Sequence, residues 1–269
     1  MAVRTDPMSD QYAPIADLYD LVGPYRDRPD VDFYVEAAVA SGGPVLELGS
    51  GTGRVLIPTA RAGVKVVGLD LSPAMLDVCR TRLLAEAPEV RARVRLVRDD
   101  IRTFELGERY RLITLPFRPF QHLTTVDDQL ACLASVRRHL AEDGRLVFDL
   151  FNPSLEALVR DDLGREAGEE PEVVSPDGRR LVRRHRILSR DFVNQITHVE
   201  LIYLLTHPDG RQERLVHEFA MRYLFRFEAE HLLARAGFEV ESLYGGFDRS
   251  AFGSSWPGEM IFVARAAHG

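Results

Sequence analysis

The chain has 269 residues, of which 45% are hydrophobic and 28% charged, as is typical of a globular protein with one large domain or one domain carrying an insertion. Its net charge of -7 argues against general nucleic-acid binding, because neutralising phosphates requires a basic face. No apolar run approaches the roughly 20 residues that span a bilayer, and residues 1–6 lack the basic start and apolar core of a secretory signal. We therefore expect a cytoplasmic protein without a membrane partner.

The first part of the chain predicts a parallel α/β sheet. Short β-branched runs alternate with amphipathic stretches from Val45 onward, as in strands joined by crossover helices. Ser72 before Pro73 is a good helix start, and Asp143-Gly144 is expected to end the helix before the fifth strand. The expected strands are 44–48, 65–70, 93–98, 111–116 and 145–150, and the expected helices are 30–40, 54–62, 73–86 and 127–140.

A glycine-rich turn follows the first expected strand. Residues 45–54 read V-L-E-L-G-S-G-T-G-R, and Asp70 ends the next apolar run. Glycines let a ligand approach the main chain closely, and an acid about 20 residues further on can accept hydrogen bonds from ribose hydroxyls. This spacing predicts an adenosine pocket at the strand ends.

Two details favour S-adenosylmethionine (SAM) over a dinucleotide in that pocket. Arg54 stands where the dinucleotide pattern requires its third glycine. Glu47 would repel a pyrophosphate but attract the ammonium and sulfonium groups of SAM.

The segments E-L-G-S-G-T-G (47–53) and G-L-D-L-S-P-A-M-L (68–76) resemble the first two motifs of class I SAM-dependent methyltransferases. The resemblance covers about residues 12–150 well and 218–266 more loosely. It implies a seven-stranded, mostly parallel Rossmann-like sheet with helices on both faces, its last strand antiparallel, and an inserted antiparallel lid. Amino-sugar and glycine N-methyltransferases are similar in carrying additions near this face.

The resemblance also implies roles for individual residues. Asp70 would bind the ribose, Leu71 and Met75 would pack on adenine, and either Asp99 or Asp100, with Asp100 favoured, would accept from the adenine amino group. Residues 12–21 resemble a helix that covers SAM, with Tyr19 near its methionine end and Tyr25 and Tyr34 as weaker companions. The expected SAM-binding residues are Tyr19, Glu47, Gly49, Gly51, Gly53, Arg54, Asp70, Leu71, Met75, Asp99, Asp100, Ile101, Pro116 and Phe117.

The loop after the fourth strand is the expected centre of catalysis, because ligands of open α/β sheets bind at the carboxyl ends of strands. Within residues 115–123, Arg118, Gln121 and His122 supply a cation, an amide and an imidazole. His122 is either a general base or a group that positions the acceptor. Residues 149–153, after the fifth strand, form a second candidate wall of the acceptor pocket.

The chain changes character after residue 153. Residues 164–171 predict a linker or mobile loop, and strand-like runs follow at about 180–189, 192–207 and 211–226, with a hairpin turn at 207–210. A helix at 228–236 and strands at 238–243 and 258–266 finish the chain. We therefore predict a SAM-binding core of residues 1–155 and 218–269, and an antiparallel lid or acceptor subdomain of residues 156–217.

Two further features do not require a functional role. Residues 179–186, R-R-L-V-R-R-H-R, are either the solvated face of a strand or a surface for an anionic acceptor. Cys79 and Cys132 lie in helical patterns without zinc-ligand spacing, so we expect small buried side chains and no metal.

The sequence thus predicts an enzyme that transfers the methyl group of SAM to an N or O nucleophile of a small-molecule acceptor, with S-adenosylhomocysteine as product, acting as a monomer or homodimer. Two alternatives remain. A nicotinamide-dependent oxidoreductase is disfavoured by Glu47 and by the closing antiparallel hairpin. A non-catalytic SAM-binding scaffold is disfavoured by the functional groups of the loop at 115–123.

Overall fold

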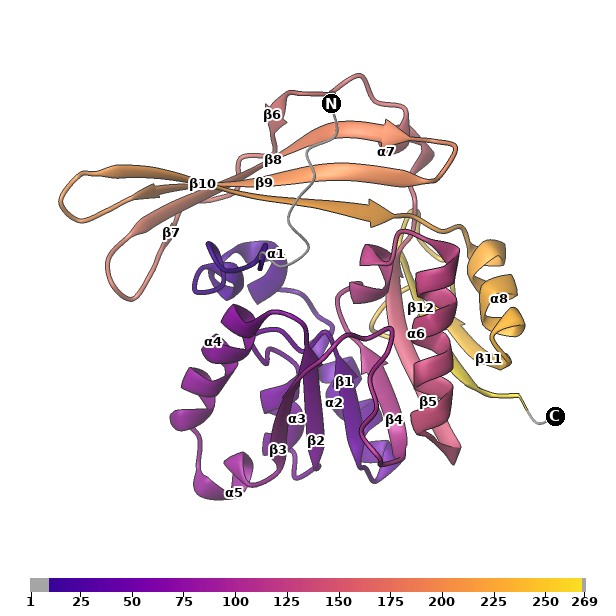
Figure 1. Cartoon of the computed structure of the whole chain (residues 1–269). Coiled ribbons are helices and arrows are strands. Elements are labelled where there is room, and N and C mark those ends of the chain that lie inside the picture. The colour runs from indigo at the N-terminus through magenta and orange to yellow at the C-terminus, as the bar shows by residue number, and fades with distance from the viewer. Residues whose placement is uncertain (1–9, 268–269) are drawn as a thin grey trace.

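The computed structural model describes residues 10–267, so residues 1–6, which carried the signal-peptide argument, lie outside the described part. Its core is one seven-stranded sheet with the strand order β11-β12-β5-β4-β1-β2-β3 (Figure 1). Only β12 runs against its neighbours, so the predicted mixed sheet is confirmed. Its strands are β1 (Val45–Leu48), β2 (Val66–Asp70), β3 (Val94–Arg98), β4 (Tyr110–Leu115), β5 (Leu140–Phe151), β11 (Phe238–Tyr244) and β12 (Glu259–Ala266).

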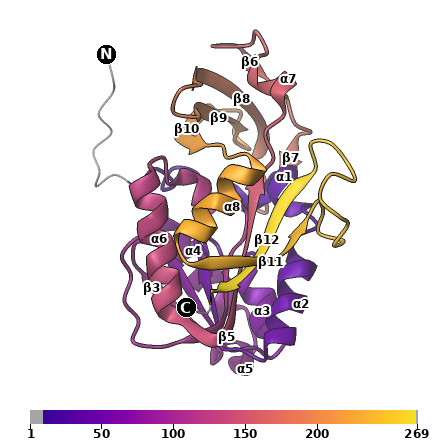
Figure 2. The ribbon, with the colours of Figure 1, turned by 90° about the vertical axis from the view of Figure 1, so that its right-hand side faces the viewer.

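Helices cover both faces of this sheet (Figure 2). One buried cluster joins Leu46 and Leu48 of β1 to apolar residues of α6 (Val126–His139) and α8 (Arg226–Arg235). The other joins Val45 to residues of α2 (Val31–Ser41) and α3 (Leu56–Arg61). Consecutive strand residues point to opposite faces, so β1 is buried on both sides. The remaining helical segments are η1 (Tyr19–Leu21), α1 (Gly23–Arg26), α4 (Pro73–Leu84), α5 (Pro88–Arg91), η2 (Pro119–His122) and α7 (Leu155–Leu158).

Two local predictions have different outcomes. The side chain of Ser72 accepts a hydrogen bond from the Met75 amide at 3.1 Å, which confirms it as the N-cap of α4. The prediction that Asp143-Gly144 ends a helix is wrong, because α6 ends at His139 and both residues lie in β5. A Cβ at Gly144 would lie 2.8 Å from the Tyr110 carbonyl oxygen, so glycine permits a close approach of two strands where the pairing of β4 and β5 is irregular.

The N-terminal segment also differs from expectation. Residues 11–18 form turns rather than a lid helix, followed by the short η1 and α1. Their apolar side chains are nevertheless buried, because Ile15 and Leu18 pack with Leu181 and Tyr203 of a second sheet. This segment is therefore held between the core and that second sheet.

The second sheet is antiparallel and lies beyond the carboxyl ends of the parallel strands (Figure 1). Its last strand extends to Arg222, past the boundary at residue 217 that the sequence suggested. Its strands are β6 (Glu166–Ala167), β7 (Val173–Val174), β8 (Arg180–Asp191), β9 (Ile196–Thr206) and β10 (Gln212–Arg222). We call β6–β10 the inserted sheet.

Acidic neighbours neutralise much of the basic stretch 179–186. Arg183 pairs with Glu170, Arg184 with Glu169 and Arg186 with Glu200. The stretch therefore forms ion pairs rather than a free cationic surface.

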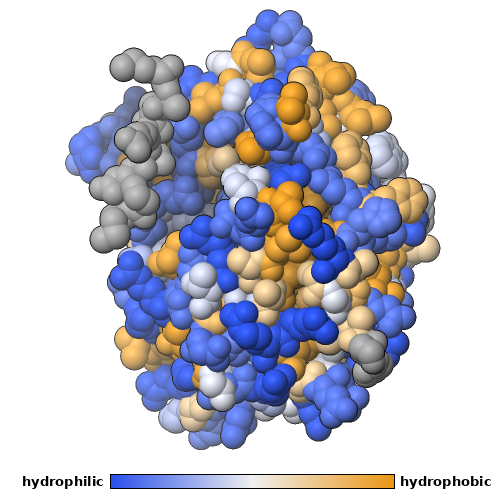
Figure 3. Space-filling view, turned by 45° about the vertical axis from the view of Figure 1, so that its right-hand side comes forward, coloured by the Kyte–Doolittle hydropathy of each residue, from blue (hydrophilic) through white to orange (hydrophobic). Residues whose placement is uncertain are grey.

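Hydrophilic and hydrophobic residues are mixed on the face shown in Figure 3, with hydrophobic ones gathered near its middle.

Cys79 and Cys132 are buried free thiols, as expected. Within residues 10–267 no group of three or more His, Cys, Asp or Glu is placed to hold a metal ion. No helix of this part is long and apolar enough to cross a membrane.

Candidate active site

A cavity of about 590 Å³ lies between the carboxyl ends of the parallel strands and the inserted sheet. That volume falls within the range of small-molecule sites. Most of the residues predicted from sequence line it: Tyr19, Glu47, Gly49, Gly51, Arg54, Asp70, Leu71, Met75, Asp100, Ile101, Pro116, Phe117, Arg118 and His122.

The glycine turn after β1 is fixed by Asp70 at the end of β2. The Gly51 amide donates to Asp70 Oδ2 at 2.7 Å, and the Ser72 amide donates to Asp70 Oδ1 at 2.9 Å. Gly49 has a φ of 71°, and a Cβ there would lie 2.8 Å from Pro119, so the turn packs closely against the loop after β4. Gly53 does not line the cavity. A Cβ at that position would lie 2.6 Å from the sulfur of Cys79, so Gly53 serves helix packing.

Glu47 is almost completely buried at the end of β1. Burial raises the pKa of its carboxyl to about 8, although the positive charge of Arg54 opposes this shift. Arg54 is held by Asp30 through two hydrogen bonds of 2.6 and 2.7 Å. A cation beside Glu47 would stabilise its charged form, so the site suits a ligand that carries an ammonium or sulfonium group.

Apolar side chains line the cavity next to β2. Leu71 is 60% exposed and Met75 is buried, and both line the cavity. Asp100 lines the cavity and Asp99 does not. Asp100 pairs with Arg102 at 2.6 Å, which holds the pKa of this carboxyl below its usual value.

Tyrosines of the N-terminal segment cover one side of the cavity. Tyr12, Tyr19 and Tyr25 line it, and the rings of Tyr19 and Tyr25 stack with centroids 4.2 Å apart. Tyr34 lies apart from them, because it is buried and its hydroxyl donates to Asp149 Oδ1 at 2.7 Å.

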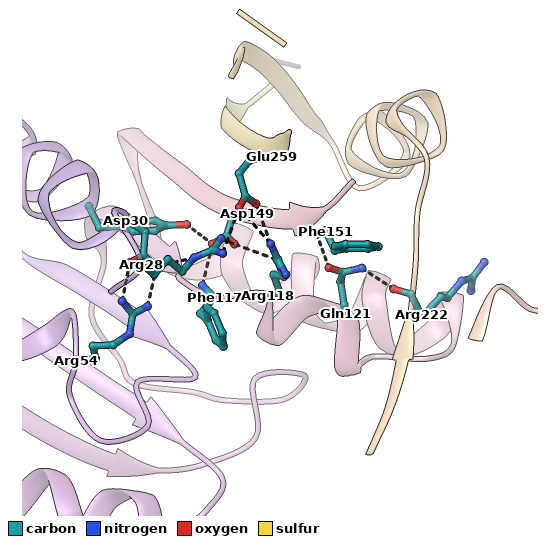
Figure 4. A network of polar contacts seen from close by, with 11 residues as sticks. Arg28, Asp30, Arg54, Phe117, Arg118, Gln121, Asp149, Phe151, Arg222 and Glu259 are labelled. Carbon is teal, nitrogen blue, oxygen red and sulfur yellow. Dashed lines mark hydrogen bonds and ion pairs between the residues drawn. The ribbon is translucent and has the colours of Figure 1, made fainter. Parts of the chain in front are cut away.

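A buried charged network supports the loop after β4 (Figure 4). Asp149, at the end of β5, accepts from the Phe117 amide at 2.8 Å and from Arg28 at 2.9 Å. Arg118 pairs with Glu259 at 3.0 Å. Phe117 and Arg118 have positive φ values of 64° and 69°, which are unfavourable for residues with side chains, so these contacts hold the loop in a strained conformation at the cavity wall.

Gln121 and His122 of this loop have different surroundings. Gln121 is not among the cavity residues. Its side chain donates to the Arg222 carbonyl at 2.9 Å and accepts from the Phe151 amide at 2.6 Å (Figure 4). His122 lines the cavity and hydrogen-bonds with the backbone of Ala220, while burial lowers its pKa to about 4. Its imidazole is therefore neutral at neutral pH.

Sequence reasoning missed the contribution of individual residues of the inserted sheet. In β10, alternate residues face the cavity, and Leu201 of β9, the cross-strand partner of His217, faces it too. The period-2 pattern could have shown which residues share a face, but not that this face meets the strand ends of the core. The cavity residues from this sheet are Arg183, Leu201, His217, Phe219 and Met221.

Comparisons with known proteins agree with this site. Residues 45–144 match the family model of a methyltransferase domain. The chain is 27% identical over 252 residues, covering 89% of both chains, to a dTDP-3-amino-3,6-dideoxy-alpha-D-glucopyranose N,N-dimethyltransferase of Streptomyces fradiae. Among solved structures, it is similar to the CcbJ methyltransferase of Streptomyces caelestis, with 27% identity, a TM-score of 0.72, and coverage of 96% of this chain and 97% of that one.

A second similar structure carries the cofactor. The SAM-bound amino pentose methyltransferase CalS10 of Micromonospora echinaspora is 26% identical, with a TM-score of 0.63 and coverage of 98% of this chain and 99% of that one. The fold, the glycine turn with Asp70 and these matches together identify the chain as a class I SAM-dependent methyltransferase. It uses SAM to methylate a small-molecule acceptor at an N or O nucleophile.

Proposed function

We propose that this enzyme methylates an amino nitrogen of its small acceptor, and that amino sugars are the acceptor class. The observation that carries the proposal is the chemistry of the cavity wall away from the glycine turn. That wall combines aromatic and aliphatic side chains with Arg183, which pairs with Glu170, and with two imidazoles, His122 and His217, each with a pKa of about 4.

This wall suits an amine better than a hydroxyl. A neutral amine attacks through its free lone pair, whereas a hydroxyl must lose its proton to a base as it attacks. An imidazole with a pKa of about 4 is a weak base for that purpose. The relative from Streptomyces fradiae and CalS10, both named as amino-sugar methyltransferases, support the same choice.

SAM supplies an electrophilic methyl group on a sulfur that is already a good leaving group. The chain has to place the amine in line with the S–CH₃ bond and exclude water. We assign Asp70 to the ribose, Glu47 to the ammonium end, and the rings of Tyr19 and Phe117 to the enclosure of the reacting groups. The lone pair forms the new C–N bond as the C–S bond breaks, and the product ammonium then loses a proton to solvent.

We assign the inserted sheet to the acceptor, the role expected of the lid and acceptor subdomain, although the sheet extends to Arg222 rather than ending at residue 217. Five of its side chains, from β8, β9 and β10, line the cavity opposite the glycine turn.

Methyl transfer from labelled SAM to matched acceptors tests the proposal. The amine probe is dTDP-3-amino-3,6-dideoxy-α-D-glucopyranose, the sugar in the name of the Streptomyces fradiae relative. Its control carries a hydroxyl in place of the amine. We expect one or two methyl groups on the nitrogen and none on the control. Transfer to the hydroxyl control would contradict N-methylation, and SAM binding without transfer to the aminated sugar would contradict the acceptor class.

A further inference from the structure

His217 is the most unusual polar side chain of the cavity. It is 3% exposed, lines the cavity from β10, and both of its ring nitrogens lack a hydrogen-bond partner among residues 10–267. A buried polar group without a partner costs stability, so each such group in a native fold calls for an explanation.

Packing fixes where the ring lies. The ring centroid of Tyr12 is 4.5 Å from that of His217, and the centroid of Phe219 is 5.0 Å from it. Phe219 in turn lies 5.4 Å from His122. This row of rings runs from the N-terminal segment through β10 to the loop after β4. His217 is therefore positioned in the part of the cavity wall that we assign to the acceptor.

His217 and His122 differ in their hydrogen bonding. His122 is hydrogen-bonded to the backbone of Ala220, whereas neither ring nitrogen of His217 has a partner in the described part of the chain. Burial and the nearby His122 lower the pKa of His217 to about 4, so its ring is neutral. A neutral imidazole has one N–H donor and one nitrogen acceptor, and a ligand hydroxyl can serve either of them.

We propose that His217 is a specificity-determining residue that binds the hydroxyl group at carbon 4, next to the amine of the acceptor. This inference rests on the proposed N-methylation of an amino sugar and adds the feature by which one amino sugar is chosen over another. A site that pairs a buried polar group with a substrate hydroxyl discriminates strongly against the analogue without it, because that group is then left unpaired.

Two sugars named in relatives provide a matched pair of probes. dTDP-3-amino-3,6-dideoxy-α-D-glucopyranose carries a hydroxyl at carbon 4, beside the amine, and dTDP-3-amino-3,4,6-trideoxy-α-D-glucopyranose lacks it. The variants are His217→Phe, which keeps a ring without polar atoms, and His217→Gln, which keeps a donor and an acceptor. His198→Phe is the control, because His198 lies on β9 with the opposite strand parity to Leu201, on the other face of the inserted sheet.

We expect His217→Phe to raise the KM of the dideoxy sugar on the order of 10- to 100-fold, with a much smaller change for the trideoxy sugar. His217→Gln should recover part of the loss, and His198→Phe should behave as wild type. The Kd of SAM should change less than about 2-fold in all variants, and the Tm of His217→Phe should not fall, since the substitution removes an unpaired buried polar group.

An unchanged KM for the dideoxy sugar in His217→Phe would overturn the proposal, as would an equal loss on both sugars. A lowered Tm together with weaker SAM binding would show that His217 is structural. If wild type methylates neither sugar, the proposed acceptor class fails and the inference fails with it. If wild type is active on the dideoxy sugar and His217→Phe is equally active, only the role of His217 is contradicted and the proposed acceptor class stands.

Discussion

The wall of the cavity next to the parallel sheet consists of turns at strand ends, whereas the opposite wall consists of alternate residues along the strands of the inserted sheet. In the first wall, Gly51 and Asp70 are joined by a backbone hydrogen bond of 2.7 Å, so sequence spacing and geometry are directly connected. In the second, His217 and Phe219 are placed by strand register and by packing between neighbouring rings. A wall of the first kind is suited to an unchanging cofactor, and one of the second kind to acceptors that differ between enzymes.

The largest effect is expected where the core supports both walls. Asp149→Asn removes the buried negative charge that pairs with Arg28, and it weakens the hydrogen bond that the side chain accepts from the Phe117 amide. Breaking a buried ion pair from one side typically costs about 3 kcal/mol or more. Chemical denaturation should show a loss of that order, with methyl transfer reduced more than SAM binding.

Glu259→Gln is the matched control for Asp149→Asn, because both carboxylates pair with Arg28 and Arg118 but Glu259 is partly exposed. It should cost clearly less. Equal losses in the two variants would show that the support of the loop does not depend on Asp149 in particular.

The cofactor wall is tested by Asp70→Ala. Loss of a charge-assisted contact to ribose should weaken SAM binding by about 1.5–3 kcal/mol, or roughly 10- to 150-fold in Kd. Asp99→Ala at the end of the neighbouring strand is the control, because Asp99 does not line the cavity. Calorimetry that finds unchanged SAM binding in Asp70→Ala would remove Asp70 from the cofactor site.

His122 lies where the two walls meet. Because its pKa is about 4, His122 is already neutral at pH 6–8, and a loss of activity through its protonation should begin only as the pH falls towards 4. We expect His122→Gln to lower kcat/KM about 10-fold, mainly through the acceptor's KM. A fall in kcat of about 100-fold or more would instead make His122 the general base.

The smallest effect concerns the proton on Glu47. With a pKa of about 8, this carboxyl is protonated in the free protein at pH 7, and the cationic groups of SAM should release that proton. Calorimetry in buffers of different ionisation enthalpy should detect release of up to about one proton per SAM, absent in Glu47→Gln.

The same pKa affects the stability of the free protein. An unfolded glutamate loses its proton near pH 4.5, so between that pH and about 8 the folded state holds a proton that the unfolded chain does not. Stability should therefore fall as the pH rises through this window, and Glu47→Gln should reduce the slope. If the Tm of Glu47→Gln falls with pH as steeply as that of wild type, a group other than Glu47 carries the proton.

Much of the core was predictable, because its signals are local. The apolar runs that end at Glu47 and Asp70, and the cap at Ser72, are visible within a few residues of sequence. The end of α6 was misplaced because the Asp143-Gly144 signal is equally suited to a helix end and to an irregular strand, and only the contact with Tyr110 distinguishes them.

The acceptor wall and its supporting network were less predictable, because their partners are distant in sequence. Arg28 and Asp149 lie 121 residues apart, and no spacing rule connects them. The unpartnered ring of His217 is equally invisible in a sequence, since it depends on which face of β10 meets the core. Such features appear only when the two sheets are placed together.

Gln121 has a further consequence for how such enzymes diversify. Its side chain bonds to Phe151, where the chain leaves the core, and to Arg222, where the inserted sheet ends. Departure and return thus converge on one amide of the core, so both ends of the intervening segment are held by the same side chain. Grafting residues 152–222 from a relative, with Gln121 retained, is therefore a direct route to new acceptors on an unchanged SAM-binding core.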